Sequence, residues 1–184
     1  MPIAPPTPLK AGLFARGGAP KVAKPTATGA PPPKAPSGIQ IEHRIGIQAP
    51  AEVIWGLIYD LGSWAEWNPT YSKAEGDIRI GGRLAMTVTL PGQAPMEIRP
   101  TVLEWVPNEQ LHWRVSAVGG LIKTTRYIEI EALAEASCIV SNGEYIGGFL
   151  GTSLARRMGR SMHRGFTAMN EALKARAEAQ ARTS

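Results

Sequence analysis

The chain has 184 residues, 43% of them hydrophobic, which is enough for the core of one ordinary domain with an appendage. Ten of its sixteen prolines lie within residues 1–37, together with five basic residues and no acidic one. The remainder holds 15 basic and 15 acidic residues, so the net charge of +5 belongs to this N-terminal segment. A folded domain that binds nucleic acid carries its own basic patch, so nucleic acid is not an expected partner.

Residues 1–38 are predicted to form a disordered tail rich in proline, alanine and lysine. The tail lacks the apolar core of a secretory signal, and no run approaches the roughly 18 apolar residues of a membrane span. We therefore expect a cytoplasmic protein without a transmembrane segment. The single cysteine, Cys138, agrees with a reducing compartment and is expected to fill the core. An alternative hypothesis is that the tail binds a protein partner or an acidic surface.

The folded part begins with an alternating pattern from Ile39 to Ile47, which predicts a strand with one buried face. Pro50 is suited to the first turn of a helix that continues to Ile58. A second short helix is predicted from Asp60, a candidate N-cap, to Glu66. The Trp67-Asn68-Pro69 segment ends it, because a residue before proline avoids the helical conformation.

Alternation at period two then predicts an antiparallel meander that reaches almost to Gly147. Its first strand runs from Leu84 to Leu90 and turns at Pro91-Gly92. The next strand continues from Met96 to Val102, where Pro100 suggests a sheet edge or a bulge. Further strands follow around Leu111–Val115, Ile128–Ile130 and Cys138–Ile146.

A long helix is predicted from Phe149 to Ala177, because apolar residues recur there at spacings of three and four. Arg156, Arg160 and Arg164 fall on the opposite face. Since helix and sheet each present one apolar surface, the sheet is expected to curl around the helix. The stripe is rich in methionine and interrupted by glycines, which favours a cavity wall over a tightly filled core. The stripe consists of Leu150, Leu154, Met158, Met162, Phe166, Met169 and Leu173.

This order of elements, together with three segments of the sequence, resembles the START-like or SRPBCC superfamily, and especially its polyketide cyclase/dehydrase-like members. The segments are Ala49–Trp55, Asp60–Pro69 and Gly143–Phe149. The resemblance covers Ile39 to Glu178, and we assign the ligand-binding domain to residues 39–180. It implies an α+β helix-grip fold, in which a curved antiparallel sheet wraps around the C-terminal helix and leaves a cavity for an apolar ligand.

Three polar residues share the inward phase of the last hairpin. If Ala134-Glu135 is a two-residue turn, Arg126 lies beside Asn142 and diagonal to Glu144. One interpretation is a paired cluster that lines the cavity and fixes the polar group of a ligand. The other is a half-exposed salt bridge on a hairpin that twists out of the core.

Other candidate ligand contacts are aromatic rings, which can stack on a planar ligand, and methionines, which can form an adaptable wall. Trp64 and Trp67 are predicted to stand at an entrance, because they flank a loop that Tyr59 and Tyr71 bracket. Core packing is the alternative explanation for all of these residues. The candidates are Tyr59, Trp64, Trp67, Met86, Trp113, Met158, Met162 and Phe166.

The first functional hypothesis is a carrier or binding protein for a small hydrophobic ligand, without a cofactor. The rival is a cyclase/dehydratase-type enzyme that uses Glu144 and Arg126, and the third is an interaction module recruited through its tail. No metal-ligand spacing is present. His43 and His112 are interpreted as outward-facing strand residues, and His163 as lying at the edge of the helix stripe.

Overall fold

The computed structural model describes residues 38–183, so the predicted tail, apart from its last residue Gly38, lies outside the described residues. The element order is strand, two helices, a series of strands and a long helix, as the sequence predicts. The helical elements are α1 (Ala51–Tyr59), the short 3-10 helix η1 (Leu61–Ser63), α2 (Trp64–Trp67), the 3-10 turn η2 (Val118–Gly120) and α3 (Gly151–Ala181). The strands are β1 (Ile39–Ile47), β2 (Tyr71–Gly76), β3 (Leu84–Val88), β4 (Met96–Ile98), β5 (Thr101–Val106), β6 (Gln110–Ala117), β7 (Ile122–Ala134) and β8 (Ser137–Gly147).

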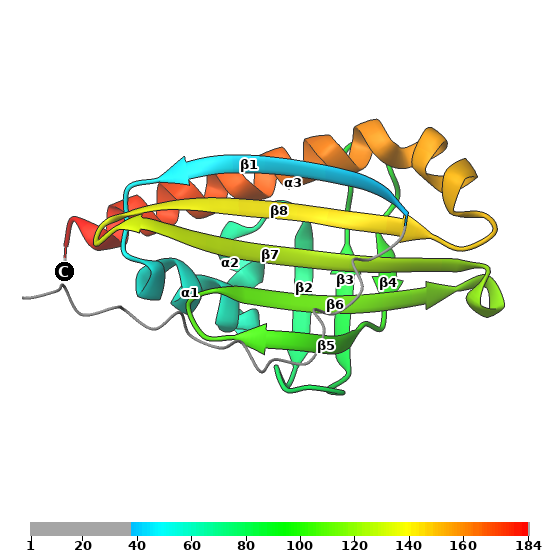
Figure 1. The fold of residues 1–184 in the computed structure, drawn as a ribbon, viewed down its shortest axis with the longest axis horizontal. Helices are drawn as coiled ribbons and strands as arrows, with labels where there is room; N and C mark the ends of the chain where they lie inside the picture. Colours follow the sequence, from blue (N-terminus) through cyan, green and yellow to red (C-terminus); the bar gives the residue numbers. More distant parts are fainter. Residues whose placement is uncertain (1–37, 184) are drawn as a thin grey trace, which may run out of the picture. The chain divides into compact units, whose positions relative to one another are not determined.

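The strands form two antiparallel sheets, and α3 runs along the β1 edge of the larger one (Figure 1). The larger sheet has the order β1-β8-β7-β6-β5 and the smaller one the order β2-β3-β4. The prediction of one continuous meander is therefore wrong at Pro100, where the chain leaves β4 and enters β5. Proline has no N–H to donate to a strand ladder, so a break at Pro100 loses fewer hydrogen bonds than a break at another residue would.

The alternation pattern did not single out strand β2. Only Tyr71 and Ala74 are buried in it, and its register against β3 shifts between Tyr71 and Lys73. A bulge of this kind adds a residue to one strand and so breaks the period of two. The alternation of β2 was therefore not recognisable in the sequence, although the residues of β2 still pair with β3.

The hairpin of β7 and β8 differs from its prediction by one residue. Ala134 pairs with Ser137, so the turn consists of Glu135-Ala136, and a bulge lies between Ala132 and Ala134. As a result Arg126 stands directly opposite Glu144, while Asn142 faces Ile128. The predicted inward phase is confirmed, because the exposed fraction is 3% for Arg126 and 0% for Asn142.

Helix α3 begins two residues later than predicted and continues four residues further. Its stripe is confirmed: Met162, Phe166, Met169 and Leu173 are buried, and Leu154 is partly buried. The arginines of the opposite face are exposed. Among residues 38–183, no helix combines the length and apolar character needed to cross a membrane.

A buried chain of amides fastens α3 to the first and last strands. The Asn170 side chain donates to both the ring Nδ1 and the backbone carbonyl of His43, at 3.0 Å each. Its Oδ1 accepts from the Asn142 amide at 2.8 Å. His43 therefore points toward the helix, and the prediction that it faces outward is wrong. Its phase matches that of the isoleucines of β1, which the sequence already shows to be the buried set.

Helix α1 buries Ile54, Trp55 and Ile58, and Pro50 occupies its N-cap position. Asp60, predicted as an N-cap, makes no capping hydrogen bond through its side chain. Its backbone carbonyl accepts the Ser63 hydroxyl instead, at 2.9 Å. The short helices thus form where predicted, but backbone turns rather than the carboxylate fix them.

Candidate functional site

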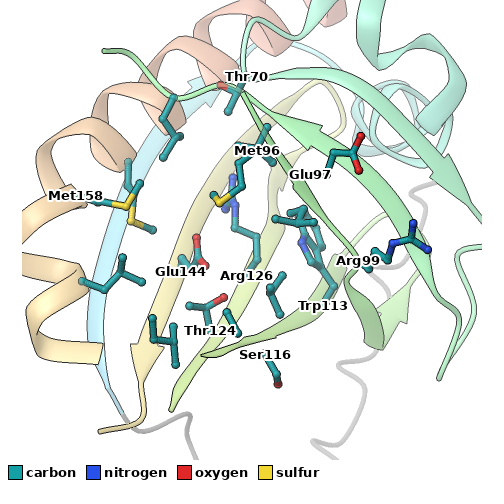
Figure 2. A pocket seen from close by; sticks show the side chains of 18 of the residues that line it. Thr70, Met96, Glu97, Arg99, Trp113, Ser116, Thr124, Arg126, Glu144 and Met158 are labelled. Carbon is teal, nitrogen blue, oxygen red and sulfur yellow. The ribbon is translucent and has the colours of Figure 1, made fainter. Parts of the chain in front are cut away.

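A cavity of about 460 Å³ lies among α3, the smaller sheet and the inner face of the larger sheet (Figure 2). Most of its wall is hydrocarbon, and aromatic rings and flexible thioethers contribute to it. The polar lining is confined to a few side chains at two levels. The apolar wall comprises Tyr71, Val88, Leu90, Met96, Ile98, Trp113, Val115, Ala117, Val118, Ile122, Leu154, Met158, Met162 and Phe166.

Arg126 is the charged group buried deepest in this wall. Its Nη1 donates to the carbonyls of Tyr127 and Gly143, at 3.0 and 2.8 Å. The guanidinium carbon lies 4.0 Å from the centre of the Phe166 ring and 5.6 Å from that of Trp113. These rings stabilise the cation through their faces, but they do not neutralise it.

One edge of this guanidinium is incompletely hydrogen-bonded within the described residues. Nε is buried and has no hydrogen-bond partner, and Nη2 makes a weak hydrogen bond to the Met169 sulfur, at 3.9 Å. The Tyr71 hydroxyl also interacts with the Arg126 side chain, which partly offsets the rise that burial causes in the pKa of Tyr71. None of the ion pairs within residues 38–183 includes Arg126. A buried donor without an acceptor is costly, so this edge is a candidate anchor for an oxygen atom of a ligand.

Glu144 projects beside Arg126 from the neighbouring strand, and Thr124 lies next to both (Figure 2). Burial raises the pKa of the Glu144 carboxyl, while the Arg126 charge and a hydrogen bond with Thr124 oppose the rise. Burial also raises the pKa of Tyr71, which feels both charges. The cavity floor thus combines a fixed cation with a carboxyl group that holds its proton more tightly than an exposed one.

The second polar level lies on the rim, where β4 and β6 contribute exposed side chains. Glu97 of β4 and Arg99, which follows β4, are exposed, as is Ser116 on β6. Met96 is also exposed, at 48%. The cavity therefore has an open, polar rim of mixed charge and a buried, cationic floor.

Six of the predicted ligand contacts lie together around this cavity: Trp113, Arg126, Glu144, Met158, Met162 and Phe166. The remaining five, Tyr59, Trp64, Trp67, Met86 and Asn142, are not among its lining residues. Trp113, Arg126, Glu144 and Met158 can be seen converging on one space in Figure 2. The inward phase of the hairpin and the stripe of α3 were therefore the more informative patterns.

The prediction that Trp64 and Trp67 stand at an entrance is wrong. Trp64 has an exposed fraction of 0% and Trp67 of 9%. The Trp64 indole donates to the carbonyls of Leu57 and Ile58, and its ring packs edge-on against Tyr71 at a centroid distance of 5.0 Å. The position of these two tryptophans beside a loop did not indicate exposure, because this loop folds inward over the core.

The other three side chains have structural surroundings of their own. Tyr59 is 47% exposed and packs against Trp55 and Trp105, away from the cavity lining. Met86 is buried in the core, and Asn142 turns toward Asn170 on α3. His112, predicted to face outward, pairs with Glu129 at 2.9 Å on the outer side of the sheet.

A family model described as "Polyketide cyclase / dehydrase and lipid transport" matches residues 38–178 of the chain. The chain belongs to this family. A comparison with curated proteins finds no match. The helix-grip fold and the START-like superfamily, expected from the resemblance, are confirmed by this match and by the solved structures.

Three solved structures illustrate the shared fold. A protein of Nitrosomonas europaea is 17% identical, with a TM-score of 0.62, and the match covers 77% of this chain and 96% of that one. A START superfamily protein from Mycobacterium smegmatis is 19% identical, with a TM-score of 0.59 and coverage of 78% and 99%. The Zhui aromatase/cyclase of a Streptomyces species is 16% identical, with a TM-score of 0.61 and coverage of 77% and 94%.

Three of the cavity residues that were not among the candidates show why such residues were missed. Thr124 shares the inward phase of Arg126 and Ile128, so the sequence held the signal for it. Tyr71 was recognised only as a loop neighbour, because the bulge in β2 hides its phase. Glu97 lies on an edge strand of three residues, which is too short to show a period.

Within residues 38–183, no three His, Cys, Asp or Glu side chains gather as they would around a metal ion. The floor of the site offers a guanidinium, a carboxyl group and the hydroxyls of Tyr71 and Thr124. A cation with free donors can hold an oxyanion or a carbonyl oxygen. A carboxyl group with a raised pKa can exchange a proton near neutral pH.

Replacing Glu144 with glutamine is expected to stabilise the protein at alkaline pH. The folded-state pKa of Glu144 lies above the ordinary 4.5, so its contribution to stability is complete below that pH. The contribution is lost as the pH rises through the folded-state pKa, because unfolding releases the carboxylate into water. Denaturant unfolding of both proteins across this range should show an advantage of Glu144→Gln that grows with pH. Glu97→Gln, a change at the exposed rim, should show no such growth, and an equal pH profile for Glu144→Gln and the wild type would contradict the expectation.

Proposed function

We propose that the protein binds a small hydrophobic ligand, of lipid, aromatic or polyketide-like character, between α3 and the sheets, as a carrier or binding protein. The observation that supports this best is the cavity of about 460 Å³, whose wall is mostly apolar. Pockets of roughly 300–1,000 Å³ with apolar walls and a few converging polar groups are typical of small-molecule sites. In this proposal the apolar body of the ligand contacts the wall, and its polar end meets the free edge of Arg126.

Family membership supports the same proposal, because the family description includes lipid transport as well as polyketide cyclases and dehydrases. The residues that α3 contributes to the wall also support the proposal. Met158 and Met162 face the cavity with flexible thioethers, which adapt to ligands of different shape.

Replacing Met162 with tryptophan tests the proposal by filling the cavity. We expect the wild type to bind the neutral apolar dye N-phenylnaphthylamine, and Met162→Trp to bind it at least about tenfold more weakly, which corresponds to about 1.4 kcal/mol. Dye fluorescence should be excited at a wavelength that indole does not absorb. Arg160→Trp adds the same ring to the exposed face of α3 and should bind like the wild type. Equal binding by Met162→Trp and the wild type would show that this cavity is not used.

A second candidate is a cyclase/dehydratase-type enzyme, and the raised pKa of Glu144 beside Arg126 favours it. In a dehydration, the Glu144 carboxylate would take a proton from the carbon next to a ketone. The Arg126 guanidinium would hold the resulting enolate oxygen. Glu144 would then return the proton to the departing hydroxyl group, giving an enone and water.

The enzyme candidate is tested by the titration of Glu144 itself. NMR of protein labelled at the glutamate carboxyl carbons should show one group with a pKa above the ordinary value, and Glu144→Gln should remove that signal. Glu97 provides the comparison, because it lines the same cavity at its exposed rim. If Glu144 titrates as an exposed carboxyl does, the group has no proton to exchange near neutral pH, and the enzyme candidate is withdrawn.

A further inference from the structure

We infer that the ligand carries a single carboxylate, which binds the free edge of Arg126, and that Glu144 takes up one proton when the ligand binds. This inference rests on the proposed function and adds the chemical class of the ligand and a proton linkage. It comes from the geometry of the cavity floor, where one buried cation and one acid of the cavity wall stand opposite each other on paired strands.

The hydrogen bonds of Arg126 leave one particular edge of the guanidinium free. Nη1 is occupied by two backbone carbonyls, which fixes the plane of the group. Nε has no partner, and Nη2 has a weak contact with the Met169 sulfur. The Tyr71 hydroxyl also interacts with Arg126, but it is neutral and does not balance the charge of the guanidinium. In a guanidinium, Nε and Nη2 donate side by side, which is the geometry that a carboxylate accepts with its two oxygens.

The burial of this edge strengthens the argument. Arg126 is 3% exposed, so bulk water does not satisfy its donors. An arginine at the protein surface would leave such an edge to solvent at little cost. Here the unmet hydrogen bonds are a reason for tight binding of an oxygen-bearing ligand, and two converging donors favour two oxygens over one.

The charges that face Glu144 decide the proton linkage. Arg126 faces it from β7, and the Tyr71 hydroxyl faces it from β2, with Thr124 as a neutral neighbour. The part of α3 that lines the cavity contributes Leu154, Met158, Met162 and Phe166, which carry no charge. On the rim, Glu97 of β4 and Arg99, which follows β4, carry opposite charges.

Consider a ligand carboxylate that enters while Glu144 is ionised. Two negative charges would then share one guanidinium in a site of low dielectric. Two carboxyl groups in such a site cannot both remain ionised without a large cost in free energy. If Glu144 is protonated, the ligand carboxylate balances Arg126 alone, and the neutral carboxyl can donate a hydrogen bond. Burial already raises the pKa of Glu144 in the free protein, so this proton is gained at a smaller cost than at an exposed site.

Decanoate and decanol serve as matched probes, because they share one chain and differ in the charge of the head group. Binding to the full-length protein should be measured from roughly pH 6 to pH 9, where decanoate stays ionised. Above the pKa of Glu144 in the free protein, we expect the affinity for decanoate to fall about tenfold per pH unit, as uptake of one proton requires. The affinity for decanol should not fall. Calorimetry in two buffers of different ionisation enthalpy should count the proton directly.

Three variants assign the effect to its residues. Glu144→Gln should bind decanoate with no pH slope and no proton uptake. Glu97→Gln, a matched change at the exposed rim, should keep the wild-type slope. Arg126→Gln should lose the preference for decanoate over decanol, and its circular dichroism spectrum and unfolding transition will show whether it remains folded.

The outcomes separate this inference from the proposed function. Equal binding of decanol and decanoate, without a pH slope, would overturn the inference and leave the apolar site standing. A slope that persists in Glu144→Gln would also overturn it, because the proton would then bind elsewhere. If neither probe binds while the wild type is folded, the proposed function is contradicted and the inference falls with it.

Discussion

Replacing Trp64 with alanine is expected to lower the free energy of unfolding by about 3–5 kcal/mol, the range observed when a large aromatic side chain is removed from a core. Trp64 is fully buried, and its ring packs against Trp67, Tyr71 and Trp113. Its indole N–H also joins the backbone at the end of α1 to the start of α2. Alanine would leave both a void and two carbonyls without their donor.

Urea unfolding measured by circular dichroism would test this expectation. Tyr59→Ala is the matched control, because it removes an aromatic ring of the same segment that is 47% exposed. That change should cost less than about 1.5 kcal/mol, which is what an aromatic pair at the surface contributes. If Trp64→Ala unfolds like the wild type but binds the apolar dye more weakly, Trp64 is a ligand contact rather than a core residue.

Replacing Asn170 with alanine is expected to destabilise the protein by about 2–4 kcal/mol, although it removes only a small side chain. The change deletes three hydrogen bonds and leaves the Asn142 amide and the His43 Nδ1 without partners. A buried polar group that loses its partner costs about 1–3 kcal/mol, so the partners left behind dominate the effect. The helix α3 should detach from β1 more readily as a result.

Hydrogen exchange would locate this effect, because amides of β1 and of the middle of α3 should lose protection before those of β6. Arg164→Ala, on the exposed face of the same helix, should stay within about 0.5 kcal/mol of the wild type. The double variant Asn142→Ala/Asn170→Ala should be less destabilised than the sum of the single variants, since each single change strands the other amide. Strict additivity would contradict the network.

The same network gives a pH dependence with a definite sign. Burial lowers the pKa of His43, aided by the proximity of His163, while Glu171 opposes the shift. A histidine whose folded-state pKa is depressed contributes stability above its ordinary value of 6.5, and that stability is lost as the pH falls toward the folded-state pKa. Protonation of Nδ1 would also remove the acceptor that Asn170 uses.

Much of the candidate site was predictable because it lies on long, regular elements. On α3 and its N-cap residue Leu150, seven apolar residues repeat with helical spacing, so their common face could be assigned without knowledge of the neighbours. On β7 and β8, the phase of Arg126 and Glu144 relative to the isoleucines and valines placed both inside. The register was one residue off, since a bulge near the turn cannot be read from alternation.

The errors share a different cause. Trp64 and Trp67 belong to a segment of short helices, where no period distinguishes the inside from the outside, and their burial depends on the strands that pack over them. Tyr71 lies in the bulged strand β2, and Glu97 lies in a strand of three residues. The error at His43 has a different origin. Its position in the alternating pattern of β1 was clear, but it was assigned to the outer face of the sheet.

The sequence by itself determined the order of the elements, the apolar stripe of α3 and the inward phase of Arg126, Asn142 and Glu144, because each depends on local periodicity within one element. Only the tertiary structure decided which of these polar groups meet. Asn142 turns to Asn170 on the helix, whereas Arg126 and Glu144 remain together at the cavity floor. The split of the strands into two sheets at Pro100 brings β4 to the rim and leaves room for a cavity. Such contacts join residues far apart in the chain, and their free energy depends on packing that no single segment encodes.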